Sequence, residues 1–370
     1  MNEKDNKITP RILQSKDSVL PLGKACSRGL GEKKALSTEP YKGVRDFYPE
    51  DMAVQNYIFG VWKKVAEEFG YQEYASSLLE PAELYRTKGN DEIVNEQMFT
   101  FTDRGEREVA LRPEMTPSLA RMVAARLKSL KFPLRWYTIA NCFRYERPQR
   151  GRRREHWQLN ADVMGIGGVE AEVEIISLAH AIMKAFGAKD EDFEIRVNNR
   201  QLLIEWFSKK YGITDENSLT QVMRTLDRKA KITEAEFKNE LTPILQDKYE
   251  AFRKELDLDI DSFVQMLNAE KQHSTLIKLK SELENKENPI KIIFDKTIAR
   301  GFDYYTGMVF EVFDTHAENR RSLFGGGRYD NLLEMFGVDP VPTVGFGMGD
   351  ITIRDFLETH KLPTTVSSPL

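Results

Sequence analysis

The densest concentration of side chains that could do chemistry lies between Phe143 and Asp162. Two strand-like runs there flank a short loop, and the segment contains six arginines. A guanidinium group presents a planar fork of donors that suits phosphate oxygens. Positive charges this close repel one another unless an anion or nearby acids, here Glu146 and Glu155, neutralise them. The segment therefore indicates either a polyanion site or a solvated basic hairpin with salt bridges.

Other short segments, together with this one, resemble the signature boxes of the histidyl-tRNA synthetase family, which belongs to the class II aminoacyl-tRNA synthetases. The arginine-rich segment resembles motif 2 of that family. In chain order, the other matching segments are Lys42–Phe47 with Pro49, Leu111–Thr116, Arg300–Tyr305 with Val309–Val312, Gly325–Asp330 and Val344–Gly349. Met115 stands where the family's Leu–Arg–Pro–Glu–Gly–Thr box has glycine. The match runs in the family's order from about Tyr41 to Phe356.

The resemblance implies a two-step reaction. Histidine is activated by ATP to histidyl-adenylate and pyrophosphate, and is then transferred to the 3′ end of its tRNA. Because a carboxylate must attack a phosphate, fixed cations are needed to overcome the repulsion between two anions. The resemblance gives this catalytic role to Arg144 and Arg300. It also implies Mg²⁺ between the β- and γ-phosphates, whereas the sequence shows no His/Cys cluster for a transition metal.

Binding roles follow from the family positions. The histidine-binding positions are matched here by Glu114, Thr116, Gln158, Asp162, Tyr304 and Tyr305. An ammonium group needs acceptors, and a neutral imidazole carries one donor and one acceptor. Asp162 would therefore accept from the ring N–H while Tyr305 donates to the other ring nitrogen. ATP contacts are expected from Arg112, Arg144, Glu146 and Arg154, and tRNA contacts from Arg150, Arg152 and Arg153.

The sequence departs from the family pattern at two places. The segments Gly325–Asp330 and Val344–Gly349 resemble the run into the family's motif 3, which has an ATP-contacting arginine three residues after the last glycine. Thr352 stands at that position here, and Arg354 comes two residues later. A shift of two residues turns a helical side chain to nearly the opposite face, so we interpret Arg354 as a surface residue. The chain stops at Leu370, after a Pro/Thr/Ser stretch. We therefore expect this chain to be a catalytic core without the family's anticodon-binding domain. Such a core is expected to charge tRNA poorly.

A run of three glycines, Gly325–Gly327, could be mistaken for a phosphate-binding loop. No Lys–Ser/Thr pair follows it, and it does not link a strand to a helix as such a loop requires. We interpret it as a place of close strand packing under the active site.

The elements that must position these residues follow from hydrophobic periodicity. Helices are expected over 51–67, from 117 onward, over 170–186 and over 351–359. Strands are expected over 74–79, 97–102, 108–112, 134–143, 156–165, 194–197, 290–295, 304–314 and 343–349. Because most of these strands are joined by hairpin-like turns, we predict an α+β fold: an antiparallel sheet flanked by helices, with a helical insertion that has its own small core.

Five segments are expected along the chain. Residues 1–40 form a basic tail, either disordered or an arm that touches a polyanion. Residues 41–200 and 290–360 form the two parts of the catalytic core. The helical insertion between them, residues 201–289, is poor in glycine and rich in Leu, Lys and Glu, and residues 361–370 form a linker stub.

Composition limits the class of protein. The chain has 370 residues, 41% hydrophobic and 30% charged, with a formal net charge of −4. This suits a globular protein of two or three domains, and any nucleic-acid partner must be met by a local basic patch. No stretch approaches the roughly 20 apolar residues of a membrane helix. The two cysteines, and an N-terminus without a signal-like apolar run, favour the cytoplasm, and the family resemblance implies a homodimer.

Two functions remain open on this basis. The first is a histidine–tRNA ligase with ATP, histidine and tRNA as its partners. The alternative is a catalytically silent relative that acts as a regulatory subunit of histidine biosynthesis. The arginine set, including Arg144 and Arg300, favours the ligase, because a histidine-binding regulator has no need of it.

Overall fold

The computed structural model describes residues 36–87, 93–229, 232–268, 270–285, 287–299, 304–319 and 321–365, without the side chains of 270–273. The expected basic tail lies, up to residue 35, outside the described residues. Arg300 and residues 366–370 lie outside them as well. The described helices and strands all belong to the unit that begins at Pro40.

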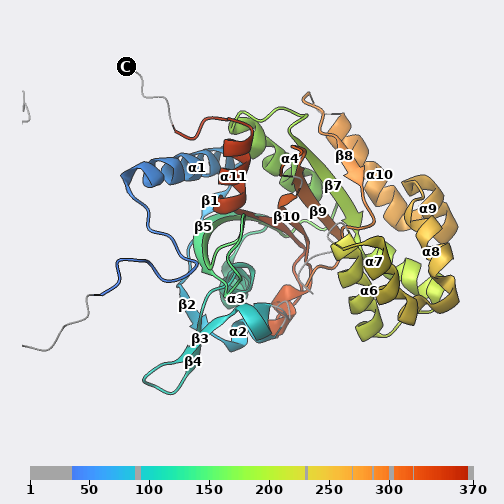
Figure 1. The fold of residues 1–370 in the computed structure, drawn as a ribbon, viewed down its shortest axis with the longest axis horizontal. Coiled ribbons are helices and arrows are strands. Elements are labelled where there is room, and N and C mark those ends of the chain that lie inside the picture. The colour runs from blue at the N-terminus through green and yellow to red at the C-terminus, as the bar shows by residue number, and fades with distance from the viewer. Residues whose placement is uncertain are drawn as a thin grey trace, which may run out of the picture. The chain divides into compact units, whose positions relative to one another are not determined.

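A sheet of eight strands is the main feature of this unit (Figure 1). In spatial order the strands are β1 (Gln72–Glu73), β5 (Leu134–Phe143), β6 (Glu155–Met164), β11 (Thr343–Gly349), β10 (Ser322–Arg328), β9 (Met308–Asp314), β7 (Phe193–Asn199) and β8 (Ile292–Phe294). The six central strands pair antiparallel, and only the edge pairs β1–β5 and β7–β8 are parallel.

A smaller antiparallel sheet precedes β5 in the chain. Its strands, in spatial order, are β2 (Leu79–Pro81), β4 (Glu108–Leu111) and β3 (Phe99–Thr102). The described helices are α1 (Pro49–Glu68), α2 (Glu83–Arg86), α3 (Thr116–Arg126), α4 (Glu170–Ala185), α5 (Arg200–Trp206), α6 (Glu216–Arg228), α7 (Glu234–Leu245), α8 (Tyr249–Leu256), α9 (Ile260–Leu267), α10 (Glu270–Glu284) and α11 (Asp350–Thr359). Within the described part of the chain, no helix combines the length and the apolar character needed to span a membrane.

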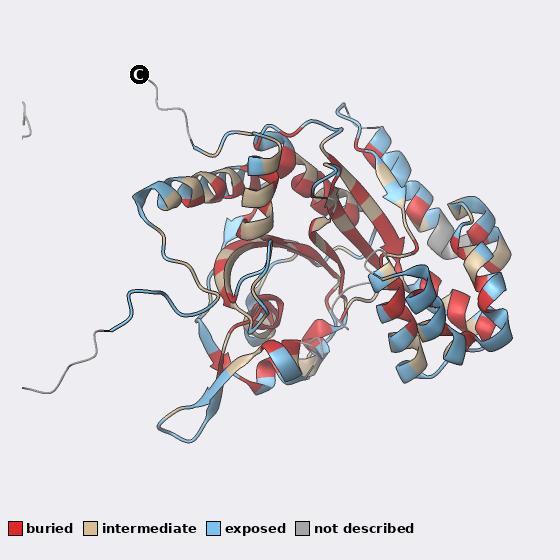
Figure 2. Cartoon of the chain, viewed as in Figure 1, coloured by how far each residue is buried: buried red, intermediate tan, exposed pale blue. Residues whose placement is uncertain are grey.

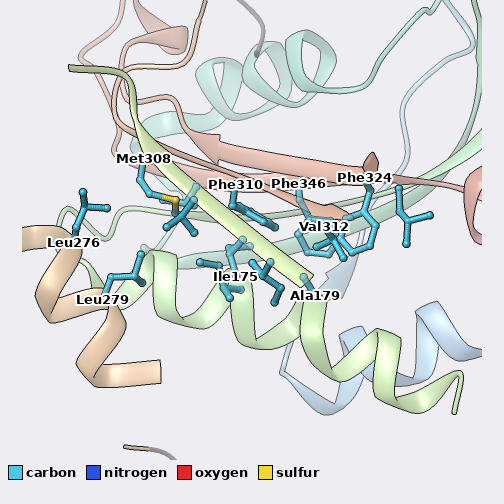
Figure 3. Close-up of a cluster of buried hydrophobic side chains, with 14 of the residues drawn as sticks. Ile175, Ala179, Leu276, Leu279, Met308, Phe310, Val312, Phe324 and Phe346 are labelled. Atoms are coloured by element: carbon cyan, nitrogen blue, oxygen red, sulfur yellow. The ribbon is translucent and has the colours of Figure 1, made fainter. Parts of the chain in front are cut away.

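Helix α4 packs against one face of the large sheet. Apolar residues at helical spacing, among them Ile175 and Ala179, point from α4 towards the strands (Figure 3). Phe310 of β9, Phe324 of β10 and Phe346 of β11 meet them from the sheet. Because side chains alternate between the faces of a strand, the residues between these core positions are free to build a site on the other face.

The segment between β7 and β8 contains helices α5 to α10. Its buried side chains, such as Trp206, Phe252 and Leu279, belong to the same cluster as the core between α4 and the sheet. The expectation of a separate small core was therefore wrong. Helix α10 packs on α4, so the apolar side chains of the insertion are continuous with the core between α4 and the sheet. Figure 2 shows buried residues on the strands of the large sheet and exposed residues on the outer sides of α6 to α9.

Several element boundaries differ from the sequence-based expectation: β9, for example, begins at Met308 rather than at Tyr304. Two of the differences have a visible physical cause. Helix α1 begins at Pro49 rather than after Asp51, as suits proline's preference for the first helical position. The strand expected over 74–79 is wrong: β1 ends at Glu73, β2 begins at Leu79, and the residues between them form no strand. Tyr74 instead packs its buried ring against Trp136, which explains the apolar signal there.

Candidate active site

Alternate residues in the middle of β6 face a cavity of about 330 Å³. Gln158, Asn160 and Asp162 line this first cavity, whereas the intervening Leu159 and Ala161 are buried in the core shared with α4. The alternation follows from the two-residue period of a strand. It places three polar side chains side by side on the face of the sheet opposite α4.

Glycines on the neighbouring strand make room for these side chains. A Cβ atom at Gly345 would lie 2.8 Å from Cγ of Asp162, and one at Gly347 would lie 2.9 Å from Cδ of Gln158. The run Gly325–Gly327 lies inside β10, which is paired on both sides. At Gly325 a Cβ would lie 2.6 Å from the carbonyl oxygen of Phe310. The glycines therefore form the floor of the cavity rather than a phosphate loop.

Glu114 is a buried acid in the wall of the first cavity. Tyr304 donates a 3.1 Å hydrogen bond from its hydroxyl to Oε2 of Glu114, while Oε1 is buried and has no hydrogen-bond partner among the residues that the structure describes. Burial raises the pKa of Glu114 to about 7, and the charge of Arg144 and the Tyr304 hydrogen bond only partly offset it. Thr116, in the first turn of α3, lines the same wall. The free oxygen can accept a hydrogen bond from a ligand.

Asp162 is a second buried acid of the same kind. Burial raises its pKa to about 7, and the hydroxyl of Tyr329, which donates to Oδ1, opposes that rise. Oδ2 is buried and has no hydrogen-bond partner within the described part of the chain. Tyr305 lines the cavity beside them, with its ring 6.3 Å from that of Tyr329. Each acid is thus held by one tyrosine and keeps one oxygen unsatisfied.

Tyr329 was not among the residues predicted from the sequence. Its signal was its place directly after the glycine strand β10, at the end of the Gly325–Asp330 box. Asn160 and Glu311, which also line the first cavity, were missed too. Both sit at alternate positions of predicted strands, so the strand period could have indicated them.

Arg144 lies where the first cavity meets a second cavity of about 210 Å³. Its Nε atom donates a 2.9 Å hydrogen bond to the carbonyl oxygen of Pro113. Arg152, Glu146 and Gln158 also line both cavities, and Arg153 lines the second. Three guanidinium groups thus surround the second cavity, which makes it suited to an anion.

His156 lines the second cavity and was not predicted. Burial, together with the positive charges of Arg144 and Arg45, lowers its pKa to about 3. The ring is therefore neutral at physiological pH. It offers one donor and one acceptor without adding charge to a wall that already carries arginines.

Two predicted ATP contacts lie elsewhere. Arg112 is buried and donates to the carbonyl oxygens of Asn141, over 2.8 Å, and Ser76, over 3.0 Å. Arg154 donates to the hydroxyl of Tyr41 over 2.9 Å, with its guanidinium 3.7 Å from the ring centre of Tyr145. Neither is among the described residues that line either cavity. Both hold the strands and the loop around the site.

Thr352 and Arg354, where the sequence departs from motif 3, make different contacts in the structure. Thr352 lines the second cavity, but its hydroxyl donates to backbone carbonyls, that of Leu323 lying 2.7 Å away. Arg354 forms ion pairs with Asp51 and Glu358, at 3.2 Å and 2.9 Å. It is not among the described residues lining either cavity, in line with a surface role. Arg300 lies outside the described residues, so its place in the site stays a prediction.

The model of the family described as "Histidyl-tRNA synthetase" matches residues 43–350. The chain belongs to the histidyl-tRNA synthetase family. A relative from Leptospira biflexa, named histidine–tRNA ligase, is 44% identical over 354 residues, which cover 92% of this chain and 80% of that protein. A histidine–tRNA ligase of Arabidopsis thaliana, described as chloroplastic/mitochondrial, is 40% identical and covers 89% of this chain and 68% of its own length.

Solved structures of the family share the fold. One from Bacillus halodurans, described as an ATP phosphoribosyltransferase regulatory subunit/histidyl-tRNA synthetase, has a TM-score of 0.74 at 25% identity, covering 88% of this chain and 84% of that one. A histidyl-tRNA synthetase from Nostoc has the same TM-score at 24% identity, covering 90% and 78%. The predicted α+β fold, with its antiparallel sheet flanked by helices, is confirmed.

Proposed function

We propose that the chain activates histidine with ATP and transfers it to the 3′ end of its tRNA. The observation that carries this proposal is the position of Arg144, whose side chain lines both the cavity with two buried acids and the cavity with three arginines. A cation at that junction lies between an amino acid in one cavity and a phosphate in the other. It would offset the repulsion between carboxylate and α-phosphate as they react.

Histidine would occupy the first cavity. Its ammonium group would be bound by Glu114, Thr116 and Gln158, and its imidazole N–H would donate to the unsatisfied Oδ2 of Asp162. Tyr305 would donate to the other ring nitrogen. Because these polar groups would be left unpaired by an apolar side chain, the site would reject apolar analogues strongly.

ATP would occupy the second cavity, with its phosphates towards Arg144, Arg152 and Arg153. Mg²⁺ would enter as part of the substrate, because phosphate oxygens and water supply most of its ligands. Glu146 lines both cavities and is the carboxylate we propose for one remaining ligand position. Arg300 would add a second catalytic cation from the segment that precedes Tyr304.

Transfer to tRNA would involve the loop between β5 and β6. We propose that Arg150, Arg152 and Arg153 of this loop contact the acceptor end, contributing affinity rather than sequence recognition. A cytoplasmic location, where its cysteines stay reduced, and a homodimer complete the proposal. Leu78, Leu79 and Phe101, on or beside the small sheet, are exposed apolar residues that a second copy could cover.

The proposal is tested by incubating the chain with ATP, Mg²⁺, labelled histidine and tRNA. It predicts acid-precipitable label on the tRNA that requires ATP and histidine, and elution as a dimer in light scattering. The alternative of a silent regulatory relative is supported by one observation, the likeness to the Bacillus halodurans structure whose description includes a regulatory subunit. Histidine binding without any charging of tRNA would favour that alternative.

A further inference from the structure

Arg321, directly before β10, joins the loop between β5 and β6 to helix α11. Its Nη1 donates a 3.0 Å hydrogen bond to the carbonyl oxygen of Arg150 in the loop. Its Nη2 donates to the carboxylate of Asp355 in α11. One guanidinium group thus connects three segments that are far apart in the sequence.

Arg150 adds a second connection to the same helix. Its Nε lies 3.6 Å from Oδ2 of Asp355, and its Nη2 donates to the hydroxyl of Thr359 over 3.3 Å. Asp355 therefore serves two arginines, one on the loop and one behind it. The side chains of Arg321 and Asp355 are only 27% and 20% exposed, so solvent screens this pair less than an ordinary surface ion pair.

Gly151 shows how closely the loop sits on Arg321. Its φ of +76° lies in the left-handed region that favours glycine, and a Cβ atom there would lie 2.7 Å from Cζ of Arg321. The Nε atom of Arg321 is buried and has no hydrogen-bond partner among the described residues. The tip of the loop is therefore packed on the guanidinium group, not merely near it.

Gly151 and the two residues that follow it line the second cavity. Arg152 and Arg153 stand there with Thr352, whose short side chain replaces the family's motif 3 arginine and contacts backbone carbonyls instead. Helix α11 therefore lacks the arginine that would contact the nucleotide in the family. Its acid Asp355 instead pairs with the arginines that hold the loop. The arginines of the loop are the cations left on that side of the cavity among the described residues.

We propose that Arg321 and Asp355 form a clamp that holds the loop so that Arg152 and Arg153 face the phosphates of ATP. The clamp is a positioning device, because neither residue is among the described residues that line the two cavities of the site. The role of the clamp in ATP binding rests on the proposed function, whereas its effect on the position of the loop does not. A loop held in one place binds a charged substrate without the entropic cost of ordering it.

Kinetics provide the first test. Arg321→Gln should raise KM for ATP in pyrophosphate exchange by about 10-fold while KM for histidine stays within about twofold, since the loop carries none of the residues that we propose to bind histidine. Asp355→Asn should act alike, whereas Asp355→Glu, which keeps the carboxylate, should restore most of the affinity. Arg354→Gln is the matched control, because this arginine lies on the same helix with 31% exposure and pairs away from the loop. An unchanged KM for ATP in a folded Arg321→Gln protein would overturn the proposal.

Limited trypsin digestion tests the clamp without any activity. Trypsin cuts after Arg150, Arg152 and Arg153, so a released loop should be cut several-fold faster in Arg321→Gln than in the wild type or in Arg354→Gln. Equal cutting in all three proteins, at equal melting temperature, would show that Arg321 does not hold the loop. If the wild type fails to exchange pyrophosphate but its loop is released by Arg321→Gln, the proposed function fails and the clamp stands.

Discussion

The Nε atom of Arg144 donates a 2.9 Å hydrogen bond to the carbonyl oxygen of Pro113, the residue before Glu114. This bond ties the arginine at the junction of the two cavities to the segment that carries one of the buried acids. The terminal nitrogens of the guanidinium group are thereby fixed in direction before any substrate arrives. Such preorganisation is what makes a fixed cation effective in a reaction between anions.

Replacing Arg144 should therefore affect the chemical step. Arg144→Gln keeps a donor for Pro113 but removes the charge, so kcat for pyrophosphate exchange should fall on the order of 100-fold or more. Steady-state exchange at saturating histidine and ATP measures it. Arg126→Gln, an exposed arginine in the last turn of α3, is the control and should leave kcat unchanged. A kcat within twofold of the wild type in Arg144→Gln would remove Arg144 from the mechanism.

The hydroxyl of Tyr329 should set the pH dependence of histidine use. Its hydrogen bond lowers the pKa of Asp162, which burial raises to about 7. Because ionised Asp162 accepts from the imidazole, kcat/KM for histidine should fall as the pH drops through about 7. In Tyr329→Phe the pKa rises further, so the fall should begin at higher pH.

A pH profile of kcat/KM for the two proteins checks this shift, since the substrate's own titration is common to both. Tyr57→Phe, a partly buried tyrosine on α1, provides the comparison. Superimposable profiles for wild type and Tyr329→Phe would show that Tyr329 does not act on Asp162.

Removing the charge of Asp162 should raise the stability of the folded protein while it lowers activity. Its folded pKa of about 7 exceeds the ordinary value of 3.8, so the folded state loses stability as the pH rises between these values. Asp162→Asn removes that penalty and should stabilise the substrate-free protein on the order of 3 kcal/mol at pH 8, with a smaller gain at pH 5. Histidine-dependent exchange should be lost in the same variant.

Melting temperatures at pH 5 and pH 8 measure the effect. Asp190→Asn is a control of opposite sign, because Lys184 lowers the pKa of Asp190 and its charge favours the folded state at high pH. A melting temperature of Asp162→Asn below that of the wild type at pH 8 would mean that the buried carboxylate is well satisfied.

The floor of the first cavity can be tested at Gly345. A methyl group there would lie 2.8 Å from Cγ of Asp162 and would push the carboxylate from its place. Gly345→Ala should raise KM for histidine by about 10-fold or more, because a small misplacement of a binding group is costly. Gly60→Ala in α1, where a Cβ meets nothing within 4 Å, is the matched control and should leave KM unchanged. Equal KM values in the two variants would contradict a histidine site against β11.

The sequence predicted those site residues whose placement depends only on their neighbours in the chain. Gln158 and Asp162 share one face of a strand, and two-residue periodicity is visible in the sequence. Arg112 and Arg154 could not be placed in the same way. Their partners, the carbonyl oxygen of Ser76 and the hydroxyl of Tyr41, are distant in the chain and become neighbours only through folding.

The second limit was aromatic packing. Tyr74 carried the apolar signal of a strand but packs on Trp136 from a segment without strand pairing. Tyr329, directly after β10, donates a hydrogen bond to Asp162 on β6, and only the sheet order β6–β11–β10 shows that the two can meet. Sheet order depends on tertiary packing, which single-sequence patterns do not contain.

The most direct test of histidine activation is pyrophosphate exchange into ATP by the pure chain without tRNA. The arrangement of Arg144 between the two cavities predicts exchange that requires histidine, that apolar amino acids do not support, and that Arg144→Gln slows on the order of 100-fold or more. Exchange no faster with histidine than without it, in a folded protein that still binds histidine, would contradict the account and leave a histidine-binding protein without ligase activity.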